Sequence, residues 1–371
     1  MTGPLAGLRI LEVGHILAGP FAAMLLADLG ADVIKIESGA GDLSRDVGSQ
    51  VVGGHNVYFA SLNRNKRSVG VDLGTPEGQE AFHAMVRDAH AVIVNMRPST
   101  IRKLGLDYRT LQEFNPTVVC VAVTGYGLDG PEAEWPAFDY VVQAGTGLAA
   151  MSGDPDGPPM LAGYSAVDNS SAIMAALGLL AKVHEGRGGQ VDVSLYDSML
   201  SQLNYKAAAY LNGGPPPARH RAGAHTFYVP AQLFETADGW LALFVTHDEF
   251  WRRLCAELDE PDWGSDKRFA TMHARFANRE ALLALLGARL RTDTAVAWAE
   301  RLRPLGLAVG AVVSLDEALD SEQVKRRGMV VSVDTDEGPL RLLGSPIRFE
   351  GTELTYAPPP HLHEHTDELL G

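Results

Sequence analysis

Short apolar runs and helix-like segments alternate along the first 125 residues. Four runs are typical of buried strands, namely LRILEV (8–13), ADVIKIE (31–37), HAVIVN (90–95) and TVVCVAVTG (117–125). Between them, apolar residues recur at helical spacing over residues 21–30, 75–89 and 101–111, and Gly30 is a typical helix stop. This alternation predicts an α/β fold, with a Rossmann-like parallel sheet covered by helices on its faces.

The pattern continues as a helix from Asp168 to about Glu185, a strand over QVDVSLYD (190–197) and a helix over residues 198–211. A glycine pair and a proline run, NGGPPPARH (212–220), then interrupt it and are typical of a linker.

Beyond the linker, a strand at ADGWLALFVT (237–246) and three helical segments (248–258, 278–290 and 293–306) predict a smaller α+β domain. A β-hairpin follows at residues 329–349, turning near Asp336. We therefore expect a large domain over residues 1–212, a small domain over 213–328, and a C-terminal segment over 329–371 that returns to the large domain.

Composition narrows the class of protein. With 371 residues, 46% hydrophobic residues and no apolar run of membrane-spanning length, the chain is typical of a soluble globular protein. Its N-terminus has no signal-peptide pattern, so we expect a cytoplasmic location. Cys120 and Cys255 lie far apart in apolar contexts and are expected to be reduced. A net charge of -15 argues against nucleic-acid or membrane partners.

Basic residues nevertheless gather in two short stretches. NRNKRS contains Arg64, Lys66 and Arg67, and MRPSTIRK contains Arg97, Arg102 and Lys103. These cations predict either a pocket for a small anionic ligand or a solvated charged surface.

Two motifs resemble cofactor sites without completing them. GHILAGP follows the first strand, where a dinucleotide-binding loop would lie, but Gly14 and Gly19 do not form GxGxxG, and Ile16 and Leu17 would hinder approach of a pyrophosphate. The alternating histidines 361, 363 and 365 lack the Cys or Asp partners of a zinc site. No bound metal is expected.

Asp168 is the one charged residue between Asp156 and Lys182. An aspartate directly before a run of helix formers is a typical N-cap, with its side chain accepting backbone N–H bonds. The same place also suits a nucleophile, because the helix dipole would keep the carboxylate ionised and apolar neighbours would exclude water. Both interpretations stay open on the residues alone.

Several motifs together resemble the class III CoA-transferase family, which includes formyl-CoA transferase and carnitine CoA-transferase. They are LRILEVGHILAGPFAAMLLADLGADVIKIE, NVYFASLNRNKRSVGVDLGTPEG, VNMRPSTIRKLGL, VTGYGLDGP, the Asp168 segment, AHTFYVPAQLFETADGWLALFV and EHTDELLG. The resemblance covers nearly the whole chain.

The resemblance implies a homodimer of two interlocked chains and an aspartate nucleophile at Asp168. It implies transfer of coenzyme A (CoA) from an acyl-CoA to a carboxylic acid through mixed-anhydride and aspartyl-CoA thioester intermediates. Acyl-CoA is then a substrate, and no permanently bound cofactor is expected. Contacts to CoA are implied for His15, Ile16, Leu17, Ala18, Val71, Asn95, Met96, Arg97, Lys103, Phe138 and Asp139.

The chain departs from the family pattern at Ser38 and Gly74, where the family often carries arginine and lysine. Arg45 or Arg97 is expected to replace the missing phosphate contacts. A glycine-rich lid has no counterpart near RHRAGAHTFYVP, which disfavours formate or oxalate as substrates. A short dicarboxylate is favoured as the acceptor, with the candidate acceptor-side residues Tyr164, Arg221, His225 and Tyr228.

An α-methylacyl-CoA racemase is the alternative on the same fold. Such relatives pair an aspartate with a histidine in a segment like PAFDYVVQAGTG, and that position is Phe138 here. Loss of one base disfavours a two-base proton exchange, unless another histidine such as His225 faces Asp168. A non-catalytic CoA-binding protein, with Asp168 only as a cap, is the third hypothesis.

Overall fold

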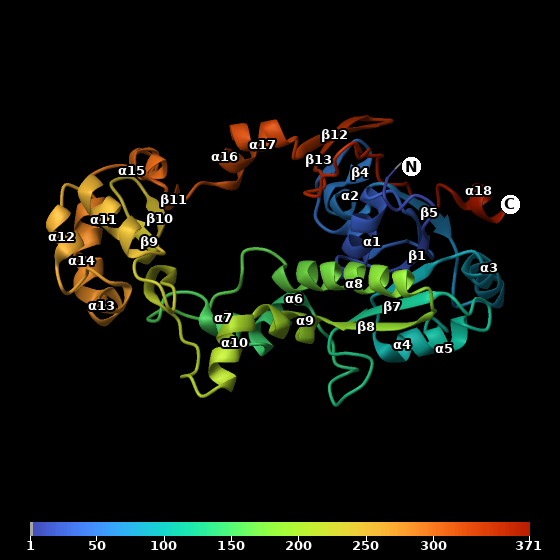
Figure 1. The fold of residues 1–371 in the computed structure, drawn as a ribbon. Coiled ribbons are helices and arrows are strands. Elements are labelled where there is room, and N and C mark those ends of the chain that lie inside the picture. Colours follow the sequence, from blue (N-terminus) through green and yellow to red (C-terminus); the bar gives the residue numbers. More distant parts are fainter. Residues whose placement is uncertain (1–2) are drawn as a thin grey trace. The chain divides into compact units, whose positions relative to one another are not determined.

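The computed structural model describes residues 3–371 and divides them into two compact units. Unit 1 comprises the residues up to Thr146 together with Ala162–Ala208 and Ser321–Gly371, and unit 2 comprises Gly147–Leu161 and Ala209–Asp320. The segment Gly147–Leu161 therefore belongs to unit 2, although the sequence analysis placed it in the large domain. Figure 1 shows the elements of both units.

Unit 1 is built on a six-stranded parallel sheet, which confirms the predicted α/β fold. Its strands are β1 (Arg9–Val13), β2 (Asp32–Glu37), β5 (Lys66–Gly70), β6 (Ala91–Val94), β7 (Val119–Thr124) and β8 (Gly189–Ser194). Their order is β5-β2-β1-β6-β7-β8, and Leu11 of the central β1 pairs with Ile34 on one side and Val92 on the other. After β1 the chain first adds β2 and β5 on one side and then β6, β7 and β8 on the other. The carboxyl ends of β1 and β6 therefore flank a topological switch point, where ligands of such sheets bind.

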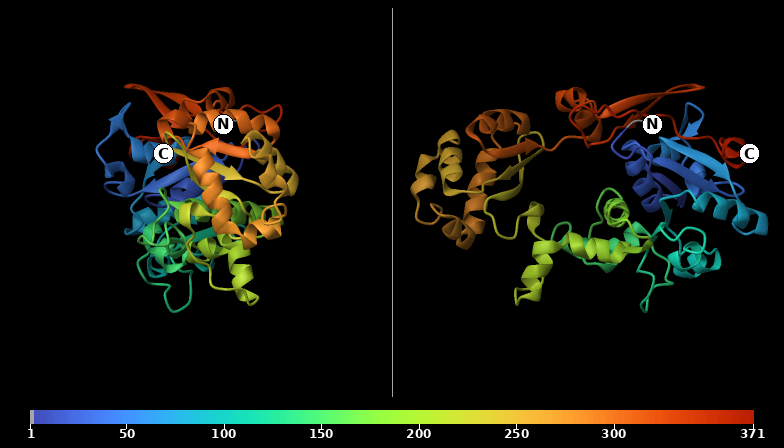
Figure 2. Two further views of the ribbon diagram at one scale, coloured as in Figure 1. Left: turned by 90° about the vertical axis from the view of Figure 1, so that its left-hand side faces the viewer. Right: turned by 45° about the vertical axis from the view of Figure 1, so that its right-hand side comes forward.

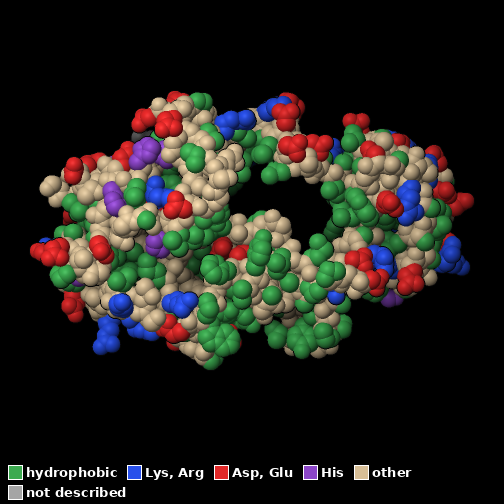
Figure 3. Space-filling view, turned by 180° about the vertical axis from the view of Figure 1, so that it is seen from behind, with side chains coloured by type: hydrophobic (Ala, Val, Ile, Leu, Met, Phe, Trp, Pro, Cys, Tyr) green, Lys and Arg blue, Asp and Glu red, His purple; other side chains and the backbone are tan. Residues whose placement is uncertain are grey.

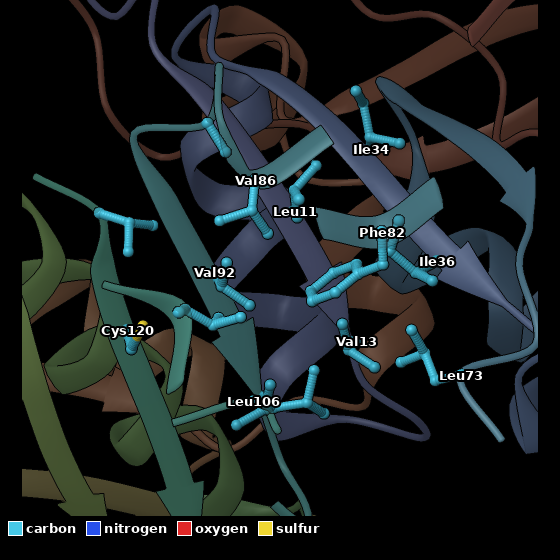
Figure 4. Close-up of a cluster of buried hydrophobic side chains, with 14 of the residues drawn as sticks. Leu11, Val13, Ile34, Ile36, Leu73, Phe82, Val86, Val92, Leu106 and Cys120 are labelled. Carbon is cyan, nitrogen blue, oxygen red and sulfur yellow. The ribbon is translucent and has the colours of Figure 1, made fainter. Parts of the chain in front are cut away.

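Helices cover both faces of this sheet. On one face, α1 (Ala18–Asp28) and α8 (Ala166–Glu185) pack against each other, and α8 lies over β7 and β8. On the other, α3 (Pro76–Val86), α4 (Pro98–Lys103) and α5 (Tyr108–Leu111) enclose the core of Figure 4, where Phe82 lies among apolar side chains of the strands. The single helix predicted over residues 101–111 is thus two, because Gly105 turns the chain at φ 65° and Asp107 caps the second.

Further elements complete unit 1. They are η1 (Leu43–Asp46), β3 (Val51–Val52), β4 (His55–Asn56), α2 (Val57–Asn63), α6 (Asp139–Gly145), α9 (Leu195–Gln202), α17 (Glu322–Arg327), the predicted hairpin β12 (Val330–Thr335) and β13 (Gly338–Leu343), and α18 (Thr366–Leu370). Helix α10 (Asn204–Leu211) spans the boundary between the units. The strand predicted to reach Asp197 ends at Ser194, because the Ser194 hydroxyl accepts a hydrogen bond from Asp197 N and begins α9.

The C-terminal histidine segment docks on strand β5. His365 N donates to Ser68 O, and Thr366 Oγ1 accepts a hydrogen bond from Gly70 N. Both views in Figure 2 show this red segment beside the blue part of unit 1. Its alternating histidines thus cover a sheet edge, and no group of three or more His, Cys, Asp or Glu within residues 3–371 is arranged to hold a metal ion.

Unit 2 contains a three-stranded antiparallel sheet of β9 (Ala231–Glu235), β10 (Trp240–Phe244) and β11 (Ala308–Ala311). Its other elements are α7 (Leu148–Met151), η2 (Arg221–Gly223), α11 (Asp248–Glu257), α12 (Pro261–Ser265), α13 (Met272–Ala277), α14 (Arg279–Leu290), α15 (Ala295–Leu302), η3 (Arg303–Leu305) and α16 (Leu315–Leu319). Trp251 and Trp298 lie fully buried in its core. The strands β9 and β11 were not predicted.

Helix α8 is the one described helix whose length and apolar composition would suit a membrane span. Val167, Ala172, Ala175 and Leu179 are buried within the protein, and the first turn of the helix carries Asp168.

Candidate active site

A cavity of about 240 Å³ in unit 1 lies at the carboxyl edge of the parallel sheet. The segments that follow β1 and β6, the end of β7 and the start of α9 all contribute to its wall, with a loop before α6 and the first turn of α8. Its lining residues are His15–Ala18, Asn95–Arg97, Val123–Gly125, Ala133, Trp135–Phe138, Asp168 and Leu195. The cavity therefore brings together nine of the predicted site residues at the switch point.

Asn95 holds the loop that follows β1. Its side-chain oxygen accepts a hydrogen bond from His15 N at 2.9 Å, and its Nδ2 donates to His15 O at 2.8 Å. A Cβ atom on Gly14 would lie 2.7 Å from Asn95 Oδ1, and one on Gly19 would lie 3.0 Å from Asn95 Cγ. Both glycines of GHILAGP thus make room for the Asn95 side chain.

The next residue of this loop, Ile16, has a φ of 68°. A β-branched residue in the left-handed region is strained by about 1–3 kcal/mol, so surrounding contacts must hold it there. Helix α1 begins directly afterwards, and its N-cap residue Leu17 makes no side-chain capping hydrogen bond. Because Leu17 and Ala18 line the cavity, the positive end of the α1 dipole can stabilise an anionic oxygen there.

Asp168 lies in the first turn of α8 and is not its N-cap, which corrects the capping interpretation. Ser165 holds the N-cap position without a side-chain capping bond. The orphan N–H groups of Val167 and Asp168 instead donate to Asp139 Oδ2, at 2.7 and 3.1 Å. A carboxylate 29 residues earlier thus caps the helix, and the Asp168 side chain is left to line the cavity.

The surroundings of Asp168 favour its neutral form. Burial, followed by repulsion from the Asp139 carboxylate, raises the pKa of Asp168 to about 7. The expectation that the helix dipole keeps this group ionised was therefore wrong in direction. A carboxylate that is poorly solvated and more basic than usual is a better nucleophile once it has lost its proton.

Asp139 lies behind the cavity rather than in its wall. The residue is buried, and Gln143 Nε2 donates to its Oδ1 while its Oδ2 accepts the two backbone bonds. The Gln143 side-chain oxygen also accepts a hydrogen bond from Ala162 N, which ties the segment before α8 to α6. We therefore describe Asp139 as a positioning residue and not as a CoA contact.

Two other predicted contacts also lie outside this cavity. The Val71 side chain is 4% exposed and belongs to the core under α3. Lys103 is exposed at the last turn of α4 and does not line the cavity. Arg97 is exposed, lines the cavity and makes no ion pair within the described residues.

The NRNKRS stretch runs from the end of α2 into strand β5, and its cations are paired within the fold. Lys66 Nζ is buried, 2.7 Å from Glu12 Oε2, and also donates to Pro20 O and Asn63 Oδ1. Burial lowers the pKa of Lys66 to about 8, although Glu12 opposes the shift. Arg64 is buried in an ion pair with Asp28, and the Arg67 guanidinium donates to both carboxylate oxygens of Asp32. Neither predicted alternative, a pocket for an anionic ligand or a solvated surface, fits Arg64 and Lys66, because both are buried in ion pairs.

Arg45, one of the two proposed replacements for the family cations, is also held within the fold. Its guanidinium donates to both oxygens of Glu37, at 2.9 and 2.7 Å, and lies 3.7 Å from the centre of the Phe59 ring. Glu37 stands where a nucleotide-binding acid would lie, but both of its oxygens are already bonded, Oε2 also to Ser68 Oγ. Of the two candidates, Arg97 is the one that faces the cavity.

Sequence reasoning did not single out several residues of the cavity wall. Thr124 ends β7, Leu195 begins α9, and Trp135 lies in the loop before α6 with 56% of its surface exposed. The order of the strands is the signal that could have found Thr124 and Leu195, because carboxyl ends of neighbouring parallel strands meet at one edge.

A larger cavity of about 570 Å³ lies elsewhere in unit 1, between the start of β5 and the C-terminal segment. It contains His55 and His361, whose rings stack at 4.4 Å, and Arg67, which is paired with Asp32 and Glu368. Its charged groups are thus largely bonded to one another. The smaller cavity is the better candidate because it contains a half-buried carboxylate with a raised pKa.

The suggested acceptor-side residues divide between the units. Tyr164 belongs to unit 1 and is exposed, whereas Arg221, His225 and Tyr228 belong to unit 2. Arg221 pairs with Asp156 within unit 2. His225 forms an aromatic contact with Tyr228, the ring centres 5.1 Å apart.

Comparison with known proteins decides the family. Residues 5–366 match CoA-transferase family III. The chain belongs to this family. It is a class III CoA-transferase, as the resemblance of its motifs implied.

Relatives in the family have named activities. The chain is 36% identical to the succinate–glutarate CoA-transferase of Agrobacterium fabrum, covering 99% of this chain and 95% of the relative. It is 35% identical to the succinyl-CoA:mesaconate CoA-transferase of Haloarcula hispanica, covering 99% and 96%. A CAIB/BAIF family protein from Brucella suis has the same fold, with a TM-score of 0.87 and 33% identity over 100% and 99% of the two chains.

Proposed function

We propose that this CoA-transferase moves CoA from an acyl-CoA donor to a short dicarboxylic acid, with Asp168 as its nucleophile. Asp168 attacks the donor thioester carbonyl, a C–O bond forms, the C–S bond breaks, and a mixed anhydride and CoA thiolate result. The thiolate attacks the aspartyl carbonyl, which gives an aspartyl-CoA thioester and releases the donor acid. The acceptor carboxylate then displaces CoA to give a second anhydride. Finally the CoA thiolate attacks the acceptor carbonyl of this second anhydride, which forms the new acyl-CoA and releases the Asp168 carboxylate.

One observation carries this proposal. Asp168 is the only carboxylate among the described residues that line the cavity, and it stands at the switch point of the sheet. The exchange needs no net proton transfer, so a single ionised carboxylate can serve every step. The positive end of α1, which opens on the same cavity, would stabilise the oxyanion of each tetrahedral intermediate.

The CoA donor is proposed to place its thioester end in this cavity. A volume of about 240 Å³ is small for a complete cofactor-sized ligand, so the nucleotide end must extend outside it. The loop residues His15–Ala18 and Met96 offer mostly apolar contacts to the pantetheine arm. Arg97, exposed and without an ion pair in the described chain, suits a phosphate, and Lys103 at the end of α4 is the second proposed cation.

Succinate-like dicarboxylates are the proposed acceptors. The support is the activity named for two relatives of similar length, one acting with glutarate and the other with mesaconate. Tyr164, Arg221, His225 and Tyr228 stay the proposed acceptor-side residues.

The active form is proposed to be the interlocked homodimer in the cytoplasm. Apolar residues of α6 and α8 that are exposed in the single chain support this, namely Tyr140, Val141, Ile173 and Leu177. Figure 3 shows hydrophobic side chains reaching the surface among charged ones. Light scattering coupled to gel filtration tests it: a dimeric mass is expected, and a stable active monomer would contradict it.

Racemase activity is the second candidate function, and one observation supports it. His15 lines the same cavity as Asp168 and supplies a second titratable group. Its Nδ1 is buried without a hydrogen bond and lies 3.9 Å from Asp42 Oδ1, so the ring is turned partly towards the protein. This orientation disfavours His15 as the partner base of Asp168.

A transfer assay in D₂O separates the two activities. Succinyl-CoA is incubated with glutarate or mesaconate and with wild-type protein or Asp168→Asn, and the recovered thioesters are identified by mass. New acyl-CoA formed by the wild type and reduced roughly 10³-fold or more by the substitution is the expected result. Incorporation of α-deuterium into a 2-methylacyl-CoA, without any transfer to an acid, would instead support the racemase.

A further inference from the structure

A buried carboxylate behind the cavity holds the strained loop of the site. Asp42 precedes the short helix η1, its side chain has no solvent exposure, and its Oδ1 accepts a hydrogen bond from Ile16 N at 3.0 Å. Ile16 is the residue whose φ of 68° places the loop against the cavity. A hydrogen bond to this amide is available only while the loop keeps that conformation.

Asp42 is itself fixed by a network of charges. Its Oδ2 lies 2.7 Å from Lys35 Nζ, and Lys35 also contacts Glu12 Oε1 at 2.6 Å and donates to Gly14 O at 3.0 Å. Ser44 N and Oγ donate to Asp42 Oδ1, both at 2.8 Å. Burial opposes ionisation of Asp42, but Lys35 and the hydrogen bonds from Ile16 and Ser44 outweigh it and lower its pKa.

The loop is therefore clamped at three consecutive residues. Lys35 holds the carbonyl of Gly14, Asn95 holds both backbone groups of His15, and Asp42 holds the amide of Ile16. Of these three clamps, the one at Ile16 restrains the residue whose own preference opposes the observed conformation.

We propose that Asp42 is a positioning residue that holds Ile16 in its left-handed conformation, so that the loop is organised for CoA before CoA arrives. This inference rests on the proposed function, because the benefit lies in acyl-CoA binding. Asp42 does not line the cavity, so its action passes through Ile16 and Leu17. Loss of the clamp leaves the free protein with a relaxed loop that must be reordered during binding, which weakens affinity.

A double-mutant cycle on Asp42 and Ile16 tests this coupling. Binding of free CoA is measured by calorimetry for the wild type, Asp42→Ala, Ile16→Gly and the double variant, with succinyl-CoA and glutarate kinetics and melting curves for each. Asp42→Ala is expected to weaken CoA binding at least tenfold and to raise KM for succinyl-CoA more than it lowers kcat.

Glycine adopts a positive φ without strain, so the Asp42 substitution should weaken binding by less than threefold in the Ile16→Gly background. Such non-additivity is specific to the clamp, because a general loss of stability would lower affinity equally in both backgrounds. Equal effects in the two backgrounds, or an unchanged affinity in Asp42→Ala, would overturn the proposal.

Amide hydrogen exchange of the wild type provides a test that requires no variant to fold. The Ile16 amide is expected to exchange at least tenfold more slowly than an unprotected amide, both with and without CoA. Protection that appears only with CoA would refute a preorganised loop. A wild-type protein that binds no CoA would refute the proposed function, while the exchange rate of the free protein would still decide whether the clamp exists.

Discussion

The backbone N–H of Asp168 donates a 3.1 Å hydrogen bond to the side-chain carboxylate of Asp139. The same contact fixes the first turn of α8 and places a negative charge beside the proposed nucleophile. Asp139 therefore orients Asp168 and at the same time helps to raise its pKa.

Substitution of Asp139 by asparagine is expected to separate these two effects. The amide oxygen can still accept the N–H bonds of α8, whereas the repulsion that raises the pKa of Asp168 disappears. In the wild type, kcat/KM for the acyl-CoA should fall as the pH drops through about 7, because the nucleophile becomes protonated. In Asp139→Asn this fall should move to lower pH. An unchanged pH profile would show that burial alone sets the pKa.

Asp168→Asn should alter the pH dependence of stability. The pKa of Asp168 is about 7 in the folded protein, against an ordinary value of 3.8 in the unfolded chain. Between these two pH values the folded state binds more protons than the unfolded state, so the contribution of Asp168 to wild-type stability declines as the pH rises. Asparagine does not titrate. The free energy of unfolding of the variant relative to the wild type should therefore rise by roughly 2–4 kcal/mol between pH 4 and pH 8. Urea unfolding at both pH values measures it, and parallel curves would contradict the shifted pKa.

Arg97→Ala should weaken binding of acyl-CoA without unfolding the protein. Arg97 is exposed, lines the cavity and has no ion pair to lose within the described residues. We expect KM for succinyl-CoA to rise about tenfold, which corresponds to one charge-assisted contact, with little change in kcat. Arg109→Ala is the matched control, because Arg109 is exposed on α5 outside the cavity. Equal KM values for the two variants would remove Arg97 from the binding site.

Lys66→Met should destabilise the protein, although the basic NRNKRS stretch that contains Lys66 is typical of a solvated surface. Lys66 is buried and its ammonium neutralises Glu12, so its loss is expected to cost about 3–5 kcal/mol. Arg102→Ala, which breaks an exposed pair with Glu134, should cost less than about 1 kcal/mol. Equal stability of Lys66→Met and the wild type in urea, together with weaker CoA binding, would instead indicate that Lys66 contacts the anionic ligand.

The arrangement of the sheet could be predicted from the sequence because it follows from local patterns. Local patterns predicted five of the six strands, and the helices between them imply parallel pairing. The edge strand β5 was missed because Lys66 and Arg67 are typical of a charged surface. Their partners Glu12 and Asp32 come from β1 and β2, and no local pattern shows that strands so far apart in sequence meet.

The position of the candidate site and its carboxylate could be predicted from the sequence, but the way in which this carboxylate is held could not. Asp168 and the His15–Ala18 loop were found, because the carboxylate stands alone in an apolar stretch and the loop follows the first strand. The roles of Asp139 and Asp42 depend on hydrogen bonds across 29 and 26 residues, to Asp168 and Ile16. The expected ionisation of Asp168 was reversed because burial, followed by repulsion from the Asp139 carboxylate, raises the pKa of this group.

The most direct test of the account is the covalent intermediate. Wild-type protein and Asp168→Ala are mixed with succinyl-CoA, quenched within milliseconds to seconds and analysed by intact-protein mass spectrometry, with hydroxylamine added to a parallel sample. The account predicts a CoA-sized adduct on the wild type, a hydroxamate that peptide mapping places at Asp168, and neither in the variant. An enzyme that exchanges CoA at its full rate without any adduct, or with the adduct on another residue, would contradict it.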